Sequence, residues 1–494
     1  MTDTPRDTVS RRRLLGGLGA AGAALAAVPV ARAALLPAPR DAARFDVVVI
    51  GTGLSGCVAA LEAAAGGARV AVLEKAAESR AGGNSARAGG YIAIPAADTP
   101  EARAAYVEDF IAKGLGRGNG DIYALMAGNV RADVAWLGEH QAGFTPQADM
   151  PPYRVAAVVA APGPYRGMPR LLKGLRARIA EKGGAFFFET KARQLILDER
   201  AAVAGVRAVG PGGVADFAAG AVVVAAGGYA ANTRMLEAYA DPNAGALMVR
   251  GNAWATGDGL AMAQDAGGGL RGMGGIASLH VAAVDPVETA AGNPFAAVPH
   301  GLAVNRDGKR FVDESLGYVA LGKATLKQPG QTAALIFDET AKALPGPSSA
   351  LATFSRLGIR TLQADSLADL AGLMGVNAAA LEGAVAEFNA AVSDGAAAGI
   401  VPPKRALAQR LETPPFHAFH PLVPGVTLTF GGIMIDPRAR VLEADGRVIG
   451  GLYAAGEGAG AVFFDDYVSG GSLANCLVMG RIAGREAAQR ASGK

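Results

Sequence analysis

Apolar and polar residues follow one another along the chain in a pattern that predicts alternating strands and helices. Residues 45–50 (FDVVVI) form a short apolar run typical of a buried strand, and residues 54–65 have the apolar spacing of a helix. A second strand follows in residues 69–75 (RVAVLEK) and ends on an acidic residue. This strand–helix–strand order predicts parallel strands joined by a crossover helix.

The pattern continues with helical spacing and then a β meander. Helices are predicted at 121–144 and 170–182, and strands of the meander within 185–198, 203–210 and 214–228. The meander ends in AVVVAAGG, a buried strand followed by two glycines. Such an ending is typical of a chain that passes close to a bound ligand.

The sequence pattern changes between residues 276 and 424. Proline-interrupted loops, a short hairpin at 302–314 and alanine-rich helices replace the earlier pattern, and PPFHAFHPLVP (414–424) suggests a hinge. Strands and glycines then resume, and a terminal helix follows. We therefore predict an α/β protein whose Rossmann-like nucleotide-binding domain is split into residues 44–275 and 425–494. An α+β cap domain, residues 276–424, is inserted between the two parts.

Glycines at the first strand–helix turn predict a dinucleotide site. Gly51 permits the tight turn, Gly53 lets the backbone approach a pyrophosphate, and Gly56 lets the helix pack closely on the strand. The phosphates would meet the free N–H groups at the start of the helix. Glu74, eighteen residues after Gly56, is placed to accept hydrogen bonds from a ribose.

The segment SRAGGNSARAGGYI (79–92) favours FAD over NAD. Its small residues allow the backbone to lie against a flat ring system, and Asn84 and Ser85 can form hydrogen bonds with phosphate or ring edges. Asp258, at a turn into a helix, is interpreted either as a helix cap or as a ligand of the ribityl or ribose. With the turn and the Gly-Gly strand end, the remaining predicted FAD contacts are Leu54, Ser55, Lys75, Gly83, Gly89, Gly90, Ala192, Ala226 and Gly227.

The amino terminus has the features of an export signal. Ser10 and the arginines at 11–13 precede a Gly/Ala-rich apolar run, and Ala31-Arg32-Ala33 offers a cleavage point, so residues 1–33 are predicted to be a twin-arginine signal. The twin-arginine translocon carries folded proteins, which suits a protein that captures its cofactor before export to the periplasm.

Charge and cysteine content narrow the function further. The formal net charge of +3 is accounted for by five arginines and two aspartates within residues 1–33, which leaves 42 basic and 42 acidic residues in the rest of the chain. This balance argues against nucleic acid as a partner. Only two cysteines occur, Cys57 and Cys476, in apolar helical stretches, so no disulfide framework, haem motif or metal site is predicted.

Seven segments in order resemble the FAD-binding flavoprotein family of fumarate reductase and succinate dehydrogenase. They are DVVVIGTGLSG, EKAAESRAGGNSARAGG, VVVAAGG, ATGDGLAMA, NRDGKRFVDE, TFGGIMID and GLYAAGEGAG. The resemblance implies FAD in the split domain and a cap that closes over the substrate. It places Gly456 and Glu457 at the ribityl chain, and Ser472 and Leu473 near the flavin at the start of the last helix. The flavin should be held non-covalently, because SARAGG lacks the histidine that some family members use for attachment.

Departures from the family motifs concern the substrate contacts. Tyr318 stands where fumarate reductases carry an arginine proton donor, and Leu428 stands where they carry a histidine. Their last arginine has no counterpart in FFDDYVSGG (463–471). Because the missing groups are those that bind carboxylates, fumarate itself is not the expected substrate.

Two branches of the family remain as alternatives. RFVDE, IFDET, TFGG and the stretch around His280 resemble the tricarballylate dehydrogenases, which would make this chain a dehydrogenase or alkene reductase of an activated organic acid. Tyr318 and Tyr467, with Ser469 in a Y-x-S pattern, resemble the 3-ketosteroid dehydrogenases.

Both branches imply hydride transfer between a substrate CH–CH bond and flavin N5. In this scheme Tyr467 and the Gly471 N–H polarise a carbonyl, Tyr318 or Ser469 transfers the proton, and His280 is a substrate ligand or an acid/base. No haem or iron–sulfur motif is present, so the electron donor or acceptor should be a separate quinone or cytochrome. A flavin electron-transfer subunit without its own substrate is the third possibility.

Overall fold

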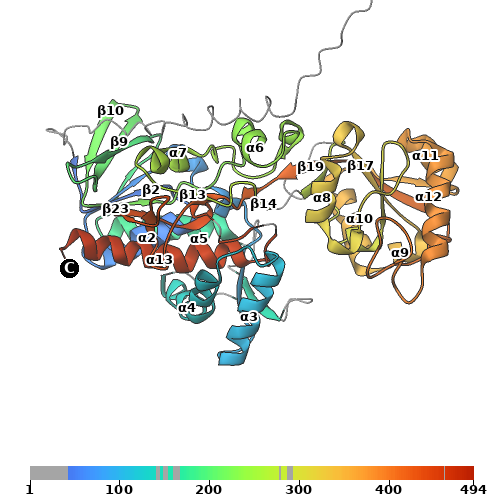
Figure 1. Cartoon of the computed structure of the whole chain (residues 1–494), viewed down its shortest axis with the longest axis horizontal. Helices are drawn as coiled ribbons and strands as arrows, with labels where there is room; N and C mark the ends of the chain where they lie inside the picture. Colours follow the sequence, from blue (N-terminus) through green and yellow to red (C-terminus); the bar gives the residue numbers. More distant parts are fainter. Residues whose placement is uncertain are drawn as a thin grey trace, which may run out of the picture.

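The computed structural model consists of two lobes that lie side by side (Figure 1). The larger lobe contains the first and last segments of the chain, and the smaller lobe is formed by an inserted segment. The predicted export signal lies outside the described residues. These are 43–140, 145–147, 154–159, 167–277, 280–285, 293–460, 462–464 and 466–493.

A six-stranded sheet forms the centre of the larger lobe. All neighbouring strands are parallel except β22 and β23. β2, β3 and β11 are buried along their whole length, which explains why they are continuously apolar rather than alternating. In sheet order the strands are β22 (Arg440–Leu442), β23 (Val448–Ala454), β11 (Ala221–Val224), β2 (Val47–Ile50), β3 (Val70–Leu73) and β7 (Ala185–Phe187). The predicted parallel strand pair is confirmed.

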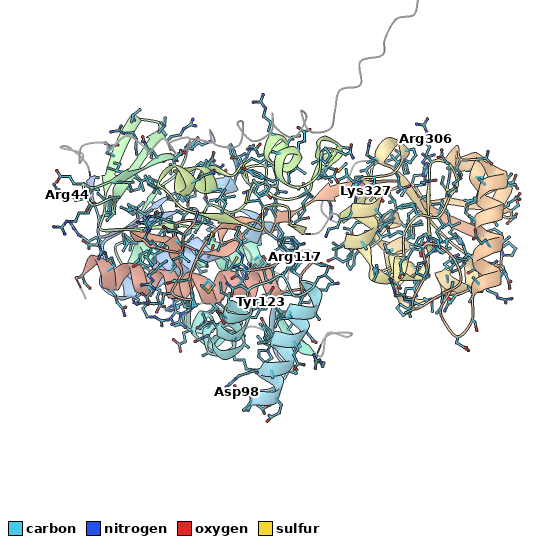
Figure 2. All side chains as sticks on the ribbon, viewed as in Figure 1. Arg44, Asp98, Arg117, Tyr123, Arg306 and Lys327 are labelled. Carbon is cyan, nitrogen blue, oxygen red and sulfur yellow. The ribbon has the colours of Figure 1, made fainter. Side chains whose placement is uncertain are left out.

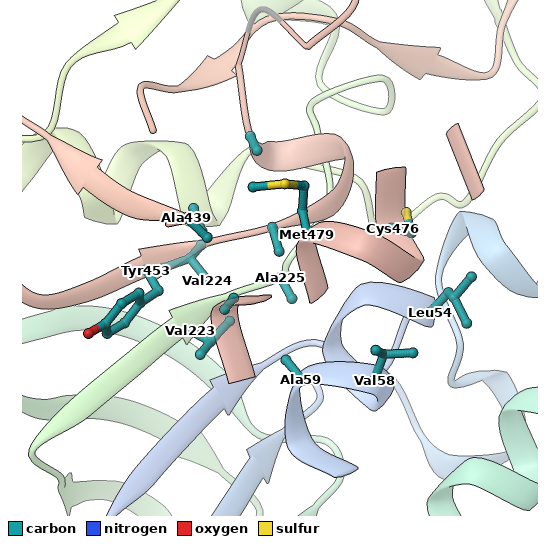
Figure 3. Close-up of a cluster of buried hydrophobic side chains, with 14 of the residues drawn as sticks. Leu54, Val58, Ala59, Val223, Val224, Ala225, Ala439, Tyr453, Cys476 and Met479 are labelled. Carbon is teal, nitrogen blue, oxygen red and sulfur yellow. The ribbon is translucent and has the colours of Figure 1, made fainter. Parts of the chain in front are cut away.

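The crossover helix α2 (Leu54–Ala65) packs between α13 (Gly471–Ala491) and α5 (Met168–Glu181). Glycines make the approach of α13 possible, because a Cβ on Gly484 would lie 2.3 Å from the Ala59 carbonyl oxygen. The side chains of α2, α13 and β11 form one continuous apolar core (Figure 3). Both cysteines of the chain are buried in it as free thiols.

Three further groups of elements complete the larger lobe. The predicted meander is confirmed in part as the sheet β1-β10-β9-β8, because residues 185–187 and residues 221–224, at its two predicted ends, belong to the central sheet instead. Its strands are Ala43–Arg44, Gly213–Ala218, Val203–Gly210 and Lys191–Leu197. Helices α3 (Pro100–Lys113) and α4 (Gly120–His140) pack with β4 (Tyr91–Pro95), β6 (Val155–Val159) and β5 (Thr145–Gln147) below α13. The remaining elements are α6 (Thr233–Tyr239), α7 (Asp258–Asp265), β13 (Leu270–Arg271), β14 (Ile276–Ala277), β20 (Leu428–Thr429) and β21 (Gly432–Ile433).

The smaller lobe is built on a mostly antiparallel sheet with a hydrophobic cluster on each face. Its strands are β12 (Met248–Val249), β19 (Phe416–Val426), β17 (Ala333–Phe337) and β16 (Leu302–Asn305), with β15 (His280–Ala283) and β18 (Leu362–Ala364) beside β19. Its helices are α8 (Tyr318–Thr325), α9 (Glu339–Lys342), α10 (Pro345–Leu357), α11 (Leu367–Met374) and α12 (Ala378–Ala391).

Two local predictions for this lobe are corrected. The segment interpreted as a hinge forms most of β19, because this strand is buried on both faces: Phe416 packs into one hydrophobic cluster of the lobe and Phe419 into the other. The predicted hairpin at 302–314 is reduced to an isolated bridge between Val304 and Arg310, since β16 pairs with β17 instead. No helix within the described ranges has the length and apolarity that a bilayer crossing requires.

Candidate active site

The turn between β2 and α2 is too crowded for side chains at two of its glycines. Gly51 has a φ of +107°, and a Cβ there would lie 2.4 Å from the Ala225 carbonyl oxygen on β11. A Cβ on Gly56 would lie 2.1 Å from the carbonyl oxygen of Gly51 itself. The turn is therefore fixed by backbone contacts and points the start of α2 at the carboxyl edge of the central sheet.

Gly53 differs from Gly51 and Gly56 because a Cβ there would make only ordinary van der Waals contacts. A Cβ on Gly53 would meet its first neighbour, the Ser85 hydroxyl, at 3.5 Å. Gly83 approaches from the opposite side, since its Cβ would lie 3.9 Å from the Gly53 Cα. The Leu54 N–H donates to Ser85 Oγ over 3.0 Å and ties the two segments together. Two side-chain-free stretches thus form a cradle at the amino end of a helix, where a pyrophosphate is stabilised.

The acidic residue at the end of β3 is held beside this cradle. Glu74 is buried and accepts hydrogen bonds from the Thr52 N–H at 3.1 Å and the Ala76 N–H at 2.9 Å. It also accepts a hydrogen bond from the Thr52 hydroxyl. These donors fix the carboxylate at the carboxyl edge of the sheet, in the place where a dinucleotide fold presents an acid to the ribose.

Asp258 does not cap its helix, which corrects one of the two interpretations offered for it. Gly257 is the residue before the first turn of α7, and the Asp258 carboxylate instead receives Lys75 Nζ at 2.5 Å and Lys191 Nζ at 2.7 Å. The two lysines come from the end of β3 and the start of β8. Their ion pairs lock α7 and the meander to the edge of the sheet, with Ala192 buried in β8 beside Lys191.

Glu457 lies at the centre of a hydrogen-bond network behind the cradle. Its Oε1 accepts from the Thr429 N–H at 3.1 Å, and its Oε2 accepts from Asn84 Nδ2 at 2.8 Å. The Asn84 Oδ1 in turn accepts from the Asn252 N–H at 2.6 Å. Burial raises the pKa of Glu457 to about 7, against the effect of these donors. The network connects segments from both halves of the sequence.

The start of α13 offers unoccupied backbone donors. Gly470, with φ +81°, precedes the helix and supplies no side-chain cap, so the first-turn N–H groups around Ser472 and Leu473 are not satisfied by a capping side chain. A small cavity next to them is lined by Ser472, Asn475, Glu457 and neighbouring residues. Asn475 is buried and its Oδ1 has no hydrogen-bond partner. This end of α13 is suited to a group that carries both donors and negative charge.

Tyr467 belongs to an aromatic cluster just before α13. Its ring lies 5.8 Å from that of Phe430 and 5.9 Å from that of Phe463, both of which are buried. The Tyr467 N–H donates to Asp466 Oδ1, and Asp466 Oδ2 forms an ion pair with Lys113 at 2.7 Å. The end of α3 therefore holds the loop that carries Tyr467 and Ser469 in place.

The other predicted catalytic residues are divided between this loop and the smaller lobe. Gly471 opens α13, and a Cβ there would lie 2.7 Å from the Phe110 ring, which explains the glycine. Tyr318 is the first residue of α8 and packs edge-on against Phe295. His280 begins β15, whose backbone pairs with β19 at Gly425. Tyr318 and Tyr467 thus lie on different lobes in this arrangement.

A family model described as "FAD binding domain" matches residues 46–472. A cytochrome-linked fumarate reductase from Shewanella frigidimarina is 31% identical over 93% of this chain and 79% of its own length. The chain belongs to this FAD-binding flavoprotein family. Relatives of this kind act on C=C and CH–CH bonds, so the protein is an FAD-dependent oxidoreductase of CH–CH groups.

Two further flavoproteins of known activity are similar to this chain. A 4-oxocyclohexanecarboxylate 2-dehydrogenase from Sinomonas cyclohexanicum is 30% identical over 93% of this chain and 95% of its own length. The 3-ketosteroid Δ4-(5α)-dehydrogenase of Rhodococcus jostii RHA1, solved with 4-androstene-3,17-dione, shares the fold with a TM-score of 0.73. That structure is 24% identical and covers 92% of this chain and 99% of its own.

The residues present fit FAD. The Gly53–Gly83 cradle leaves room that a Cβ would fill, and Asn475 Oδ1 is a buried acceptor without a donor inside the cavity at α13. Glu457 carries a buried carboxylate with no cation among its hydrogen-bond donors. A flavin ribityl chain and ring supply the hydroxyl and N–H donors that such acceptors need.

The pH dependence of stability tests the role of Glu457 in the flavin-free protein. Its folded pKa of about 7 lies above the ordinary 4.5, so the folded state binds a proton that the unfolded state releases. Stability should therefore fall as the pH rises from 4.5 to 7, by up to about 3 kcal/mol. Glu457→Gln lacks this titration. We expect urea unfolding of the two apo-proteins to show that the free energy of unfolding of the wild type falls relative to that of the variant between pH 4.5 and 7. If the two free energies change in parallel with pH, burial does not raise the pKa of Glu457.

The sequence did not predict several residues of the candidate flavin site. The aromatic partners of Tyr467, the Lys113–Asp466 ion pair and the Asn475 amide come from separate elements. The one available signal was the run FFDDY, in which two phenylalanines and a tyrosine precede the glycines of the last helix. A cavity of about 380 Å³ in the smaller lobe, lined by Asn305, Arg306 and His420 among others, was not predicted and is not part of this site.

Proposed function

We propose that this flavoprotein dehydrogenates a cyclic ketone at the CH–CH bond next to the carbonyl. The observation that supports this is the aromatic cluster around Tyr467, which occupies the place where a carboxylate-binding arginine would be expected. Phenylalanine rings pack against a flat apolar ring, whereas a phenol donates a single hydrogen bond to a carbonyl oxygen. A keto substrate needs both contacts.

The residues divide the reaction between the two lobes. The Tyr467 hydroxyl donates a hydrogen bond to the substrate carbonyl and stabilises the negative charge that develops on its oxygen. The Gly471 N–H, the second donor predicted from the sequence, donates to the Val468 carbonyl at 2.9 Å in this structure and is not assigned to the substrate. Tyr318, brought over the substrate when the lobes approach, accepts as its phenolate the proton from the carbon next to the carbonyl, with the alkoxide of Ser469 as the alternative acceptor. FAD, held by the cradle and the start of α13, would supply N5 as the acceptor of the hydride from the adjacent carbon. The double bond forms between these two carbons.

The reverse reaction, reduction of a double bond conjugated to a carbonyl, uses the same groups with the proton donated by Tyr318. The similarity to a fumarate reductase keeps this direction open as a second candidate, and with it an activated organic acid as substrate. His280 begins β15, which pairs with β19, and is proposed to contact the substrate as the lobes close.

Anaerobic mixing of the purified holoprotein with candidate substrates tests the proposal. We expect 4-oxocyclohexanecarboxylate, its methyl ester or 4-androstene-3,17-dione to bleach the yellow flavin absorbance, with the unsaturated ketone as product by mass spectrometry. Succinate serves as the matched acid without a ketone and should leave the flavin oxidised. Bleaching by succinate, with no response to any ketone, would overturn the keto assignment. Bleaching by neither class would favour a subunit that only passes electrons.

We also propose that the protein is exported and that it exchanges electrons with a separate partner. The twin-arginine pattern at residues 11–12 is expected to direct the loaded flavoprotein to the periplasm, where a quinone or cytochrome would exchange electrons with it. Replacing Arg11 and Arg12 with lysine should leave the flavin-containing protein in the cytoplasm, because the translocon distinguishes arginine from lysine at these positions. Cell fractionation measures this, and unchanged export of the double variant would contradict it.

A further inference from the structure

One cation next to the proposed substrate site has no role in the scheme above. Arg117 lies in the loop between α3 and α4, and its guanidinium carbon is 3.6 Å from the centre of the Phe464 ring. The side chain is exposed, and Figure 2 places it on the side of the larger lobe that faces the smaller one. Arg117 therefore borders the space between the lobes.

The geometry leaves the hydrogen-bonding edge of Arg117 available. A separation of 3.6 Å is the contact distance of two carbon atoms, so the guanidinium plane lies on the ring rather than pointing an N–H at it. In this stacked arrangement the N–H donors point outward, in the plane that binds a carboxylate through two parallel hydrogen bonds.

The acid Asp466 is paired without Arg117. Lys113 forms the 2.7 Å ion pair with Asp466, and Arg117 forms no ion pair with another residue of the described ranges, which leave out Asp465. The guanidinium thus keeps its positive charge for a ligand. It is also pre-positioned, because stacking on Phe464 restricts a side chain that otherwise loses considerable entropy on binding.

Arg117 is within reach of a molecule that contacts Tyr467. Phe464 and Tyr467 are three residues apart in the sequence, so their Cα atoms are separated by at most about 11 Å. The ring cluster of Phe463 and Phe430 lies beside Tyr467. The backbone therefore keeps Phe464, on which Arg117 stacks, near Tyr467, as a substrate that contacts both side chains requires.

We propose that Arg117 is a specificity residue that binds a carboxylate of the substrate at the end remote from the carbonyl. This rests on the proposed function and refines it: the substrate class becomes cyclic keto acids rather than neutral ketones. The sequence carries no cation at the family's carboxylate-binding positions, and Arg117 supplies one from a different element.

The test compares the keto acid with its methyl ester in flavin reduction. For Arg117→Gln we expect KM for the acid to rise about 10- to 100-fold, while that for the ester stays unchanged. Arg117→Lys should lie in between, because an ammonium keeps the charge but loses the two-pronged geometry. Arg306→Gln, an exposed arginine on the smaller lobe (Figure 2), is the matched control and should behave as wild type. Equal effects on acid and ester, or none on the acid, would overturn the assignment.

A binding measurement separates this inference from the proposed function. Cyclohexanecarboxylate has no ketone to oxidise, so calorimetric titration of the holoprotein reports the carboxylate contact alone, with cyclohexanecarboxamide as the neutral control. We expect Arg117→Gln to lower the affinity for the acid at least about 10-fold and to leave the affinity for the amide unchanged. If no ketone reduces the flavin but this difference holds, the keto reaction is wrong and the anion site stands. If wild type does not prefer the acid, the anion site is wrong.

Discussion

Tyr467→Phe is expected to lower kcat for flavin reduction by a cyclic ketone about 10²- to 10³-fold. The change removes one hydroxyl and keeps the ring that packs against Phe430 and Phe463, so the loop and its aromatic cluster should be preserved. What is lost is the donor that stabilises charge on the carbonyl oxygen as the neighbouring proton leaves. KM should change little, since the hydrogen bond strengthens mainly in the transition state.

The control for this effect is a second tyrosine in the same lobe. Tyr453 donates its hydroxyl to the Glu486 carbonyl at 3.3 Å on the far part of α13, and Tyr453→Phe removes that hydroxyl without touching the aromatic cluster. It should leave kcat within about twofold of wild type. Stopped-flow reduction at saturating substrate gives the rate constant of flavin reduction directly, and this constant is the quantity compared between the variants. A Tyr467→Phe variant with normal kcat would show that another group polarises the carbonyl, and the keto assignment would lose its main support.

The sequence predicted the elements of this fold that have a strong local signal. The continuous apolar run at 47–50 and the spaced glycines after it define β2, the turn and α2, because a fully buried parallel strand leaves no polar alternation. The hinge prediction at 414–424 failed for the opposite reason. Prolines and two histidines interrupt a largely buried strand, and no local pattern marked it as the strand that pairs with β17, β15 and β18.

The active site was predictable only where one short segment carries it. Gly53, Glu74 and the glycines before α13 belong to compact motifs. The partners of Tyr467 do not: Phe430 and Lys113 are joined to it by tertiary packing alone, and no local pattern links positions so far apart. Asp258 illustrates the same limit. A local rule suggested a helix cap, whereas two lysines distant in the sequence form ion pairs with the carboxylate.

Gly53→Val is expected to lower the affinity for FAD at least about 100-fold while the protein still folds. Gly53 has φ −63° and ψ 177°, a conformation that valine adopts readily, and the first atom that its Cβ would meet is 3.5 Å away. The protein therefore tolerates the side chain. The cradle does not, because the two methyl groups occupy the space between Gly53 and Gly83 where backbone must approach the pyrophosphate.

Gly51 and Gly128 provide the comparison that makes this result specific. Gly51→Ala forces a Cβ to within 2.4 Å of a carbonyl oxygen at φ +107° and should destabilise the fold itself, whereas a Cβ on Gly128 in α4 has no neighbour within 4 Å. Titration of each apo-protein with FAD by fluorescence quenching, alongside circular dichroism, separates the two effects. We expect Gly53→Val to be folded and colourless, Gly51→Ala to be poorly folded, and Gly128→Ala to be folded and yellow. If Gly53→Val binds FAD with wild-type affinity, the phosphates do not lie in this cradle, because the valine side chain would fill the space between Gly53 and Gly83.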